Sequence, residues 1–427
     1  MTAPPSVLVA GGGPAGTAAA ITLASAGVEV TLLDRARFPR EKCCGDGLTT
    51  GGLRRLAAIG LDPRAVASFT PVDALYASSP SGRVVRVPLV GPVGPVGTYA
   101  AVARRSDLDA ALIDLARAAG ATIVEGDGVS AIGPAPRGTG IAVTRTSGVV
   151  HQAQVIFAAD GARSTVRRLV REREGAPPAA AGALAGRDAW FAYRQYASGV
   201  SARAATELWV RFDPALLPGY GWSFPLGGDR VNVGIGVPRQ SGTSGKALKR
   251  SWNEVISSPF FGALLGGGAT LEGAVRAWPI PTGVRRQDLT AWSGRILFLG
   301  DAAATADPFS GEGIAQALES GVLAARAFLS GGTTGAAAAY ESAVARALFT
   351  EQRISRAARA LLSSPLGARA ALRGTAARPW ITTAVGRWLY EEFPRAALAH
   401  PRSWRQLRDV MPGAFGDVSI GASRSSG

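Results

Sequence analysis

Three features of the sequence predict an α/β fold built from several structural units. A glycine-rich turn joins an apolar run to a helical pattern within residues 6–34. Several short strands separated by turn residues follow from Trp190 to Val237, and the last hundred residues are helical and rich in arginine. Together these features predict a Rossmann-type domain with an inserted antiparallel β-sheet and a helical C-terminal region.

The composition is that of a folded globular protein. The chain has 427 residues, 47% of them hydrophobic and 18% charged, which is enough for a large core and two closely packed domains. It has no run of roughly 18 uninterrupted apolar residues, which argues against a spanning helix. The opening MTAPPSVLVAGGG lacks a basic n-region, so we expect no signal peptide and a cytoplasmic protein.

The first elements predicted are a strand over SVLVA, a turn over GGGPAG, a helix that ends at Gly27, and a strand over VEVTLLD. In the turn, Gly11, Gly13 and Gly16 form a G-x-G-x-x-G pattern. The first glycine permits a tight turn, the second lets backbone approach a pyrophosphate, and the third lets helix and strand pack closely. Asp34 ends the second strand, placed to accept hydrogen bonds from both ribose hydroxyls. We therefore predict a dinucleotide site, with the pyrophosphate at the helix N-terminus, in preference to a merely structural turn.

The middle of the chain continues the alternation of strands and helices. Residues 84–90 and 140–146 alternate as strands do, and LDAALIDLARAAGA from Leu108 has helical spacing. Residues 155–161 form a continuous apolar run, which predicts a strand buried on both faces. The low-complexity stretch near 175–186 is predicted to be a loop or domain crossover.

The next region is predicted to form an antiparallel sheet from the strands WFAYRQY, TELWVRF, GYGWSFP and RVNVGIGV. Because side chains alternate along a strand, Tyr220, Trp222 and Phe224 share one face, with Gly and Ser on the other. Two interpretations stay open: the aromatic rings pack a core, or they form a flat apolar wall for a ligand. Beyond the sheet, RILFLGD predicts a buried strand and GIAQALESGVLAARAFLS an amphipathic helix.

Residues that bind metals or form catalytic triads are scarce. Cys43 and Cys44 are adjacent, so a disulfide between them would be strained, and two thiols cannot form a structural zinc site. The histidines are His151 and His400, for which we expect structural roles. No metal site is predicted.

The net charge is +15 and comes almost entirely from arginine. One interpretation is a solvated surface; the other is attraction to a phosphorylated substrate or an anionic membrane surface, which would make peripheral membrane contact. No recognition motif favours nucleic acid. The sequence does not indicate the oligomeric state.

Two further segments resemble the second and third fingerprints of the flavoprotein family that includes aromatic hydroxylases, halogenases and geranylgeranyl reductases. They are ADGARSTVR at 159–167 and FLGDAAATADPFSGEGIAQAL at 298–318. Three fingerprints in order imply FAD as the cofactor. PREKCCGDGLTTGGL resembles the P-x-x-K-x-C-G-D-G-L segment of geranylgeranyl reductases, and DPFSGEGI is also similar to that group. The resemblance to their substrate motif, Tyr-x-Trp-x-Phe-Pro and then Gly-x-Gly, is carried by Tyr220, Trp222, Phe224, Pro225, Gly234 and Gly236.

The resemblance covers roughly residues 6–330 and implies a set of cofactor-binding residues. Arg105 or its neighbour Arg104 corresponds to the arginine that contacts the flavin nucleotide. Asp301 would bind the ribityl hydroxyls, and the helix opening near Gly313 would place its positive N-terminus near the reduced ring. The full set is Gly11, Gly13, Pro14, Ala15, Gly16, Asp34, Arg35, Cys44, Gly45, Arg105, Asp160, Gly161, Gly300, Asp301, Pro308, Gly311, Gly313 and Ile314.

The candidate catalytic residues are Cys44, Tyr220 and Trp222. Cys44 stands at the family's cysteine position, where a thiol could donate a proton to a carbon beside the one that receives hydride; the alternative is that it only packs. An ordinary thiol pKa of about 8.5 keeps it protonated at neutral pH. Cys43 is an additional neighbour that the family pattern does not require.

The predicted domains are interleaved along the chain. The FAD-binding domain comprises residues 1–70, 100–170 and 285–330, and the substrate-binding domain comprises 71–99 and 171–284. Residues 331–427 form the helical C-terminal region.

The leading functional hypothesis is an FAD-dependent reductase of carbon–carbon double bonds in a hydrophobic, prenyl-bearing substrate, with hydride from flavin N5 and NADPH or a ferredoxin as electron donor. The alternative is an FAD-dependent monooxygenase that hydroxylates a small aromatic or natural-product substrate; Ala304, where many hydroxylases have histidine, disfavours it mildly. Halogenation is disfavoured because it needs a channel lysine, and none lies in the corresponding region after residue 70. A flavin-binding scaffold without turnover is the third hypothesis.

Overall fold

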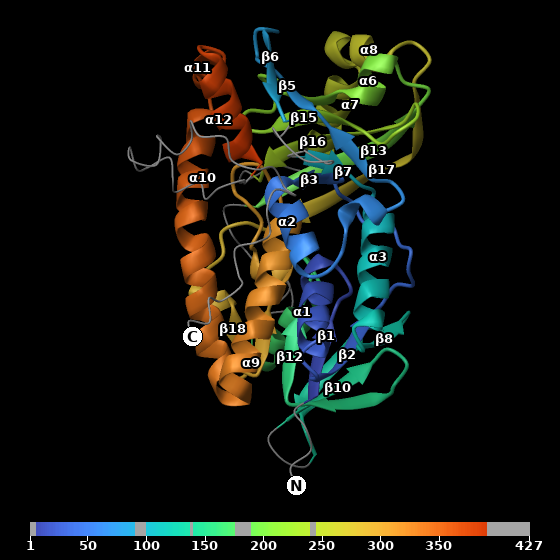
Figure 1. Cartoon of the computed structure of the whole chain (residues 1–427), viewed down its shortest axis with the longest axis vertical. Coiled ribbons are helices and arrows are strands. Elements are labelled where there is room, and N and C mark those ends of the chain that lie inside the picture. The colour runs from blue at the N-terminus through green and yellow to red at the C-terminus, as the bar shows by residue number, and fades with distance from the viewer. Residues whose placement is uncertain (1–5, 90–99, 137–139, 176–188, 240–244, 391–427) are drawn as a thin grey trace, which may run out of the picture.

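The computed structural model describes residues 6–89, 100–136, 140–175, 189–239 and 245–390, and it contains two large sheets (Figure 1). A six-stranded sheet lies in the lower half of Figure 1 and a seven-stranded sheet in the upper half, with a column of C-terminal helices beside both. His400 and most of the stretch at 175–186 lie outside the described residues. No helix of the described chain is long and apolar enough to cross a membrane.

The six-stranded sheet is the Rossmann-type part of the fold. Its strands pair in parallel except at the β18–β19 edge. The buried strand predicted over 155–161 forms only at 155–158, where all residues are buried, and residues 159–161 follow it as a partly buried loop. The strand order is β18 (Thr290–Ala291), β19 (Ile296–Phe298), β12 (Val155–Ala158), β1 (Ser6–Ala10), β2 (Glu29–Asp34) and β8 (Thr122–Glu125).

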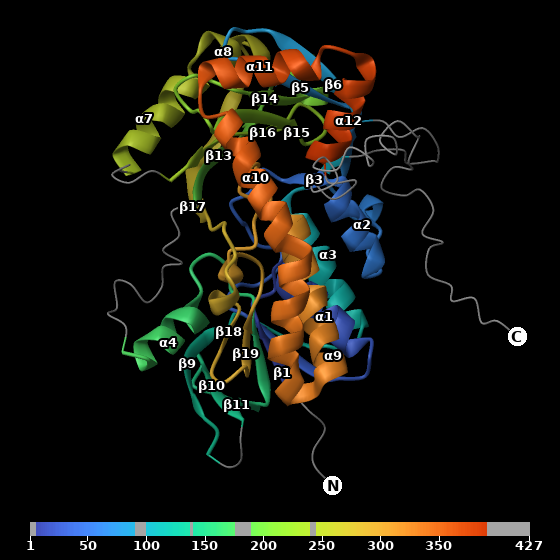
Figure 2. The ribbon, with the colours of Figure 1, turned by 90° about the vertical axis from the view of Figure 1, so that its left-hand side faces the viewer.

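Helices cover one face of this sheet and a small meander lies on its other side (Figure 2). The helices are α1 (Pro14–Ala24), α3 (Arg105–Ala118) and α9 (Ile314–Val344), and the meander consists of β9 (Val129–Pro134), β10 (Ile141–Arg145) and β11 (Val150–Ala153). Gly27, with a φ of +79°, follows the end of α1 as predicted.

The seven-stranded sheet contains the predicted antiparallel strands. Its order is β17 (Thr270–Ile280), β13 (Trp190–Ser198), β16 (Val231–Pro238), β15 (Tyr220–Pro225), β14 (Leu208–Arg211), β5 (Ala74–Ser78) and β6 (Val84–Pro88). Every pair is antiparallel except β14–β5, which is parallel. These two strands are more than a hundred residues apart in the chain, so no hairpin imposes an antiparallel pairing on them.

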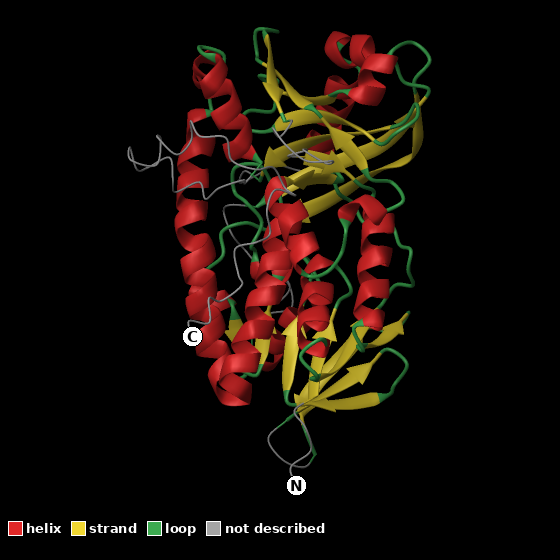
Figure 3. Ribbon diagram, in the orientation of Figure 1, coloured by secondary structure: helices red, strands yellow, loops and turns green. Residues whose placement is uncertain are grey.

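The remaining elements connect or cover the two sheets (Figure 3). A core that includes Trp209, Val233 and Ile235 lies on one face of the seven-stranded sheet, together with residues of α7 and α8. The remaining helices and strands before α9 are β3 (Gly47–Thr49), β4 (Thr70–Val72), β7 (Ala100–Val102), α2 (Thr50–Ala58), α4 (Thr165–Arg173), α6 (Ala202–Thr206), α7 (Gly245–Ile256) and α8 (Pro259–Leu265). The short 3-10 turns are Pro63–Ala65, Arg286–Asp288 and Gly300–Ala303.

The C-terminal region is helical as far as it is described. The backbone of α9 departs from helical geometry at Gly332, and a π-helical turn at Ala345–Phe349 leads into α10 (Thr350–Leu361). Two shorter helices follow, α11 (Pro365–Thr375) and α12 (Pro379–Leu389). The predicted domain boundaries stay a prediction, although the pairing of β14 with β5, and of β5 with β6, agrees with placing 71–99 and 171–284 together.

Candidate active site

The glycine-rich turn between β1 and α1 packs closely against neighbouring backbone and leaves its own backbone accessible to a ligand. Gly11 has a φ of +108°, and a Cβ there would lie 2.7 Å from the carbonyl carbon of Ala159. A Cβ on Gly16 would overlap the carbonyl oxygen of Gly11, so the helix can pack on the turn only if this residue is glycine. At Gly13 the nearest atom to a Cβ would be 3.7 Å away, and no side chain of the described residues caps the N-terminus of α1. The turn therefore leaves N–H groups available to an anion.

Asp34, at the end of β2, is buried and already holds the turn in place. Its Oδ2 accepts a hydrogen bond from the Gly12 N–H at 2.7 Å, and its Oδ1 accepts one from the Ala36 N–H at 2.8 Å. A carboxylate has about four acceptor positions, so each oxygen can still accept a hydroxyl donor.

Arg105 borders the same cavity as the turn, whereas its neighbour Arg104 does not. Arg105 donates two hydrogen bonds to Asp109 at 2.9 Å each, and Arg40 makes a second ion pair with Asp109 at 3.2 Å. Arg104 pairs instead with Asp107. The structure thus favours Arg105 as the arginine near the nucleotide.

The second and third fingerprints reach the cavity from other strands. Asp160 follows β12, and its Oδ1 is buried without a hydrogen-bond partner among the described residues. Asp301 follows β19, and burial raises the pKa of its carboxyl group. The N-terminus of α9 differs from expectation, because the Glu312 carboxylate accepts hydrogen bonds from the N–H groups of Ile314 and Ala315 at 3.2 and 3.0 Å. In this arrangement the positive end of α9 is satisfied by Glu312 rather than open to a ligand.

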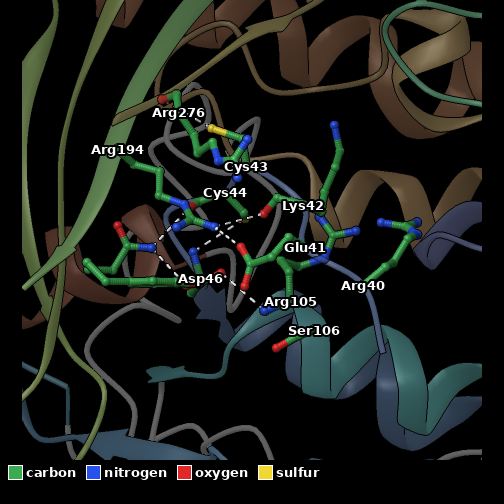
Figure 4. Close-up of polar contacts among 12 residues, drawn as sticks. Arg40, Glu41, Lys42, Cys43, Cys44, Asp46, Arg105, Ser106, Arg194 and Arg276 are labelled. Atoms are coloured by element: carbon green, nitrogen blue, oxygen red, sulfur yellow. Dashed lines mark hydrogen bonds and ion pairs between the residues drawn. The ribbon is translucent and has the colours of Figure 1, made fainter. Parts of the chain in front are cut away.

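The cysteine segment forms a loop whose side chains lie near Arg194 of β13 and Arg105 at the start of α3 (Figure 4). Both thiols are free. The Cys43 Sγ donates to the Arg276 carbonyl at 3.6 Å, and the Cys44 Sγ accepts from the Asp46 N–H at 3.3 Å. Burial raises the pKa of Cys44 to about 11, so its thiol is protonated at neutral pH.

Asp46 ties this loop to the aromatic strand. It is fully buried and accepts hydrogen bonds from Asn232 Nδ2 at 2.8 Å, Tyr196 Oη at 3.0 Å and the Arg105 N–H at 3.2 Å. Asn232 also donates to the Cys44 carbonyl at 2.8 Å and accepts from the Trp222 indole N–H at 3.0 Å. Burial raises the pKa of Asp46 to about 6 despite its three donors.

The aromatic side chains of β15 form a continuous row on one face of the sheet. Ring centroids lie 6.1 Å apart from Tyr220 to Trp222 and again from Trp222 to Phe224. The partner strand explains the two glycines of the motif: Gly236 pairs with Tyr220 and Gly234 with Trp222. A Cβ on Gly234 would lie 2.6 Å from Cε2 of Trp222, so the indole ring rests on bare backbone.

A single cavity of about 1330 Å³ joins these parts. At one end lie the glycine turn, Asp34, Arg105 and Asp301. At the other end the cavity runs between the seven-stranded sheet and helices α10–α12 and is largely apolar, lined by Leu75, Ala77, Val87, Leu208, Val210, Phe212, Tyr220, Trp222, Phe224, Leu361, Leu362, Leu372, Ile381, Val385, Trp388, Leu389 and Tyr390. We call this end the apolar arm. The Cys44 loop and Trp222 lie along the same cavity, so the aromatic wall is part of a chamber and not only of a core.

Comparisons with known proteins agree with this arrangement. Residues 5–187 match the model of the FAD binding domain. A menaquinone reductase from Mycolicibacterium smegmatis is 33% identical over 347 residues, which are 77% of each chain. A digeranylgeranylglycerophospholipid reductase from Methanopyrus kandleri is 30% identical over 74% of this chain and 78% of its own.

The chain belongs to the geranylgeranyl reductase family of FAD-dependent oxidoreductases.

A solved structure shares the fold of this chain over almost its whole length. The geranylgeranyl bacteriochlorophyll reductase-like protein from Thermoplasma acidophilum is 21% identical, with a TM-score of 0.74 over 95% of this chain and all of its own. The fold match extends past residue 330, where the sequence resemblance ended, and includes the C-terminal helices.

The residues present fit the FAD that the family implies. The open backbone at Gly13 and the uncapped end of α1 suit a pyrophosphate, and the unpartnered Asp160 oxygen and Asp301 suit hydroxyl or ring N–H donors. Most of the predicted cofactor residues line the cavity. The exceptions are Gly16, which packs α1 on β1, and Pro308, whose carbonyl accepts from the Trp190 indole at 3.0 Å.

Several residues that line the cavity were missed by sequence reasoning. Lys42 lies in the lining, with its Nζ 3.8 Å from the centre of the Trp278 ring, and burial lowers its pKa to about 8 while Asp301 opposes that shift. Lys42 precedes the region after residue 70 in which a channel lysine was sought, yet it lines the cavity. Arg163 lies against the same ring at 4.7 Å. The signal for Lys42 was present in the P-x-x-K segment, but nothing in the sequence linked β17 or α10–α12 to the cavity.

Proposed function

We propose that this protein reduces carbon–carbon double bonds in the isoprenoid chain of a lipid, and that a prenylated quinone is its best candidate substrate. The observation that carries the proposal is the cavity, which is continuous from the dinucleotide residues, past the Cys44 loop and Trp222, into the apolar arm. An extended hydrocarbon chain needs such a long apolar enclosure, whereas a small aromatic does not.

When bound, reduced FAD supplies the hydride for the reaction. The protein's own contribution is to hold an unactivated double bond in place, because isolated alkenes are poor hydride acceptors and positioning must supply much of the rate. The row of rings on β15 gives a rigid apolar surface for the chain, and its exclusion of water keeps the enclosure dry. Cys44, protonated at neutral pH, holds a proton on Sγ inside the cavity and is the candidate proton donor.

The relatives support an isoprenoid substrate. The two relatives compared above are named for menaquinone and for a digeranylgeranyl phospholipid, and both lipids carry isoprenoid chains. We also propose NADPH or a ferredoxin as the electron donor; none of the described residues distinguishes between the two.

The test is a single turnover of flavin-loaded protein, reduced with dithionite and mixed anaerobically with a menaquinone. The product is then oxidised in air before mass spectrometry, so that reduction of the quinone ring is reversed and only chain reduction remains. We expect a stable gain of two mass units per double bond. A product that returns to its starting mass would show ring reduction and defeat the proposal.

A pair of tryptophans separates the cavity wall from the sheet core. Trp222 and Trp209 lie on neighbouring strands, are 4% and 2% exposed, and each donates its indole N–H, to Asn232 and Glu207 respectively. Only Trp222 lines the cavity. Trp222→Phe should lower kcat/KM by about tenfold, as expected for the loss of one hydrogen bond and part of the wall, while flavin content is kept. Trp209→Phe should leave kcat/KM within about twofold; equal losses in both variants would show that the ring acts only through folding.

The hydroxylase alternative predicts different products. It requires consumption of oxygen and a gain of 16 mass units on an aromatic substrate. If this protein consumes oxygen or adds 16 mass units to an aromatic substrate, and does not reduce the chain under anaerobic conditions, the hydroxylase function replaces the proposed one.

A further inference from the structure

The apolar arm reaches the surface at the C-terminal helices. Leu361, the last residue of α10, lines the cavity and is 55% exposed. Gly374, near the end of α11, also lines the cavity and is exposed. Residues that face the cavity and solvent together mark an opening, so one mouth of the arm lies between these helices.

The surface beside this mouth is unusually apolar. Eight large hydrophobic residues of the described chain are exposed, and three of them, Leu361, Leu366 and Trp380, lie within twenty residues of one another in the sequence. Leu366 is 76% exposed. In Figure 2, α11 lies across the upper end of the molecule.

The helix α11 presents two distinct faces. Ala368 and Leu372 are buried, whereas the exposed residues recur at helical spacing: Leu366, Ala370, Arg373 and Ala377, the last just beyond the helix end. An apolar and arginine-bearing outer face of this kind is typical of helices that lie in a membrane interface. Trp380, at the first turn of α12, fits the same location, because tryptophan is enriched at the membrane–water interface.

The charge of this region indicates which membrane it fits. No acidic residue occurs between Glu351 and Glu391, whereas arginines recur throughout the segment. Arg373 and Arg378 are exposed. A surface with arginines and without carboxylates complements anionic lipid headgroups.

We propose that the outer face of α11 and the first turn of α12 dock on an anionic lipid bilayer, so that the mouth of the apolar arm opens directly into the lipid. The docking surface consists of Leu366, Arg373, Arg378 and Trp380. The inference that the chain of the substrate enters from the bilayer rests on the proposed function, but the docking itself does not.

Vesicle flotation of the full-length, flavin-loaded protein tests the docking. We expect the protein to float with vesicles of phosphatidylcholine containing about a third phosphatidylglycerol, and much less with phosphatidylcholine alone. Arg373→Gln with Arg378→Gln should weaken partitioning by about thirtyfold, and Leu366→Glu with Trp380→Ala should abolish it. The matched control is Leu329→Glu on α9, which makes the same charge change at a 43% exposed leucine away from the surface.

Absence of wild-type binding to anionic vesicles would overturn the proposal, and so would equal loss of binding in Leu329→Glu. A shift from dimer to monomer in Leu366→Glu, without vesicle binding by the wild type, would show that a second copy covers this face instead. None of the four docking residues lines the cavity, so turnover of a detergent-solubilised substrate should be unchanged in the variants. Vesicle binding without such turnover would defeat the proposed function and leave the docking intact.

Discussion

Gly234→Ala tests most directly whether the Trp222 indole must pack against the backbone of Gly234. A Cβ at this position would lie 2.6 Å from Cε2 of Trp222 and 2.5 Å from the carbonyl oxygen of Tyr193, whereas carbon atoms in contact lie about 3.5–4.0 Å apart. The indole ring must therefore move by about 1 Å or more, because the Tyr193 carbonyl belongs to the neighbouring strand and cannot yield. Overpacking of this kind costs about 1–3 kcal/mol, and loss of the indole hydrogen bond to Asn232 adds about 1 kcal/mol.

We expect Gly234→Ala to lower the free energy of unfolding in urea by about 2–4 kcal/mol. At a temperature where it stays folded, it should retain flavin and lose most of its turnover. Gly133→Ala is the matched control, since Gly133 is also a strand glycine and a Cβ there would meet no atom within 4 Å. A Gly234→Ala protein with wild-type kcat/KM would refute the claim that Trp222 must rest on bare backbone for the reaction.

Three further outcomes follow from the network around Asp46. Because burial raises the pKa of Asp46 from 3.8 to about 6, the native state binds the Asp46 proton more tightly than the unfolded state does. The resulting stability is complete only below pH 3.8 and is lost as the pH rises through 6. Between pH 4 and pH 6, wild type should therefore lose about 2 kcal/mol more of its free energy of unfolding than Asp46→Asn, measured by urea titration. With its pKa near 11, Cys44 in a Cys43→Ser protein should react with iodoacetamide about tenfold faster for each pH unit between 8 and 10, and a pH-independent rate would indicate a thiolate. Asn232→Ala should cost about 1–3 kcal/mol, measured by urea unfolding, by leaving the Trp222 N–H buried and unpaired; no loss of stability would mean that water replaces the amide.

The parts of the fold that sequence predicted best are those in which local pattern decides the structure. The glycine turn, the buried strand at 155–158 and the alternating strand at 220–225 each carry a period or a backbone requirement within a few residues. The parallel pairing of β14 with β5 could not be predicted in this way, because it joins segments more than a hundred residues apart.

In the site, too, residues with a fixed local spacing could be predicted and residues defined by distant contacts could not. Three glycines and Asp34 were recognisable because their spacing is fixed by the chemistry of a dinucleotide. Asn232 was not, since an asparagine in a strand has no distinctive pattern until Trp222, Cys44 and Asp46 are seen around it. The capping of α9 by Glu312 likewise depends on a side-chain orientation that the motif does not encode.

The apolar arm could not be predicted, because it is lined by C-terminal helices whose existence, but not whose position in the fold, follows from the sequence. The sequence indicated helices after residue 330, and their apolar spacing was compatible with any packing partner. Only the three-dimensional arrangement brings Leu372 and Trp388 opposite the β15 rings and makes a chamber between them.

The most direct measurement is an experimental structure of the protein with FAD and a prenylated quinone bound without oxygen. We predict that the isoalloxazine ring lies beside the loop of Cys44, with the hydrocarbon chain running along Tyr220, Trp222 and Phe224 toward α11. A flavin ring turned away from Trp222, or a chain bound outside this row of rings, would contradict it.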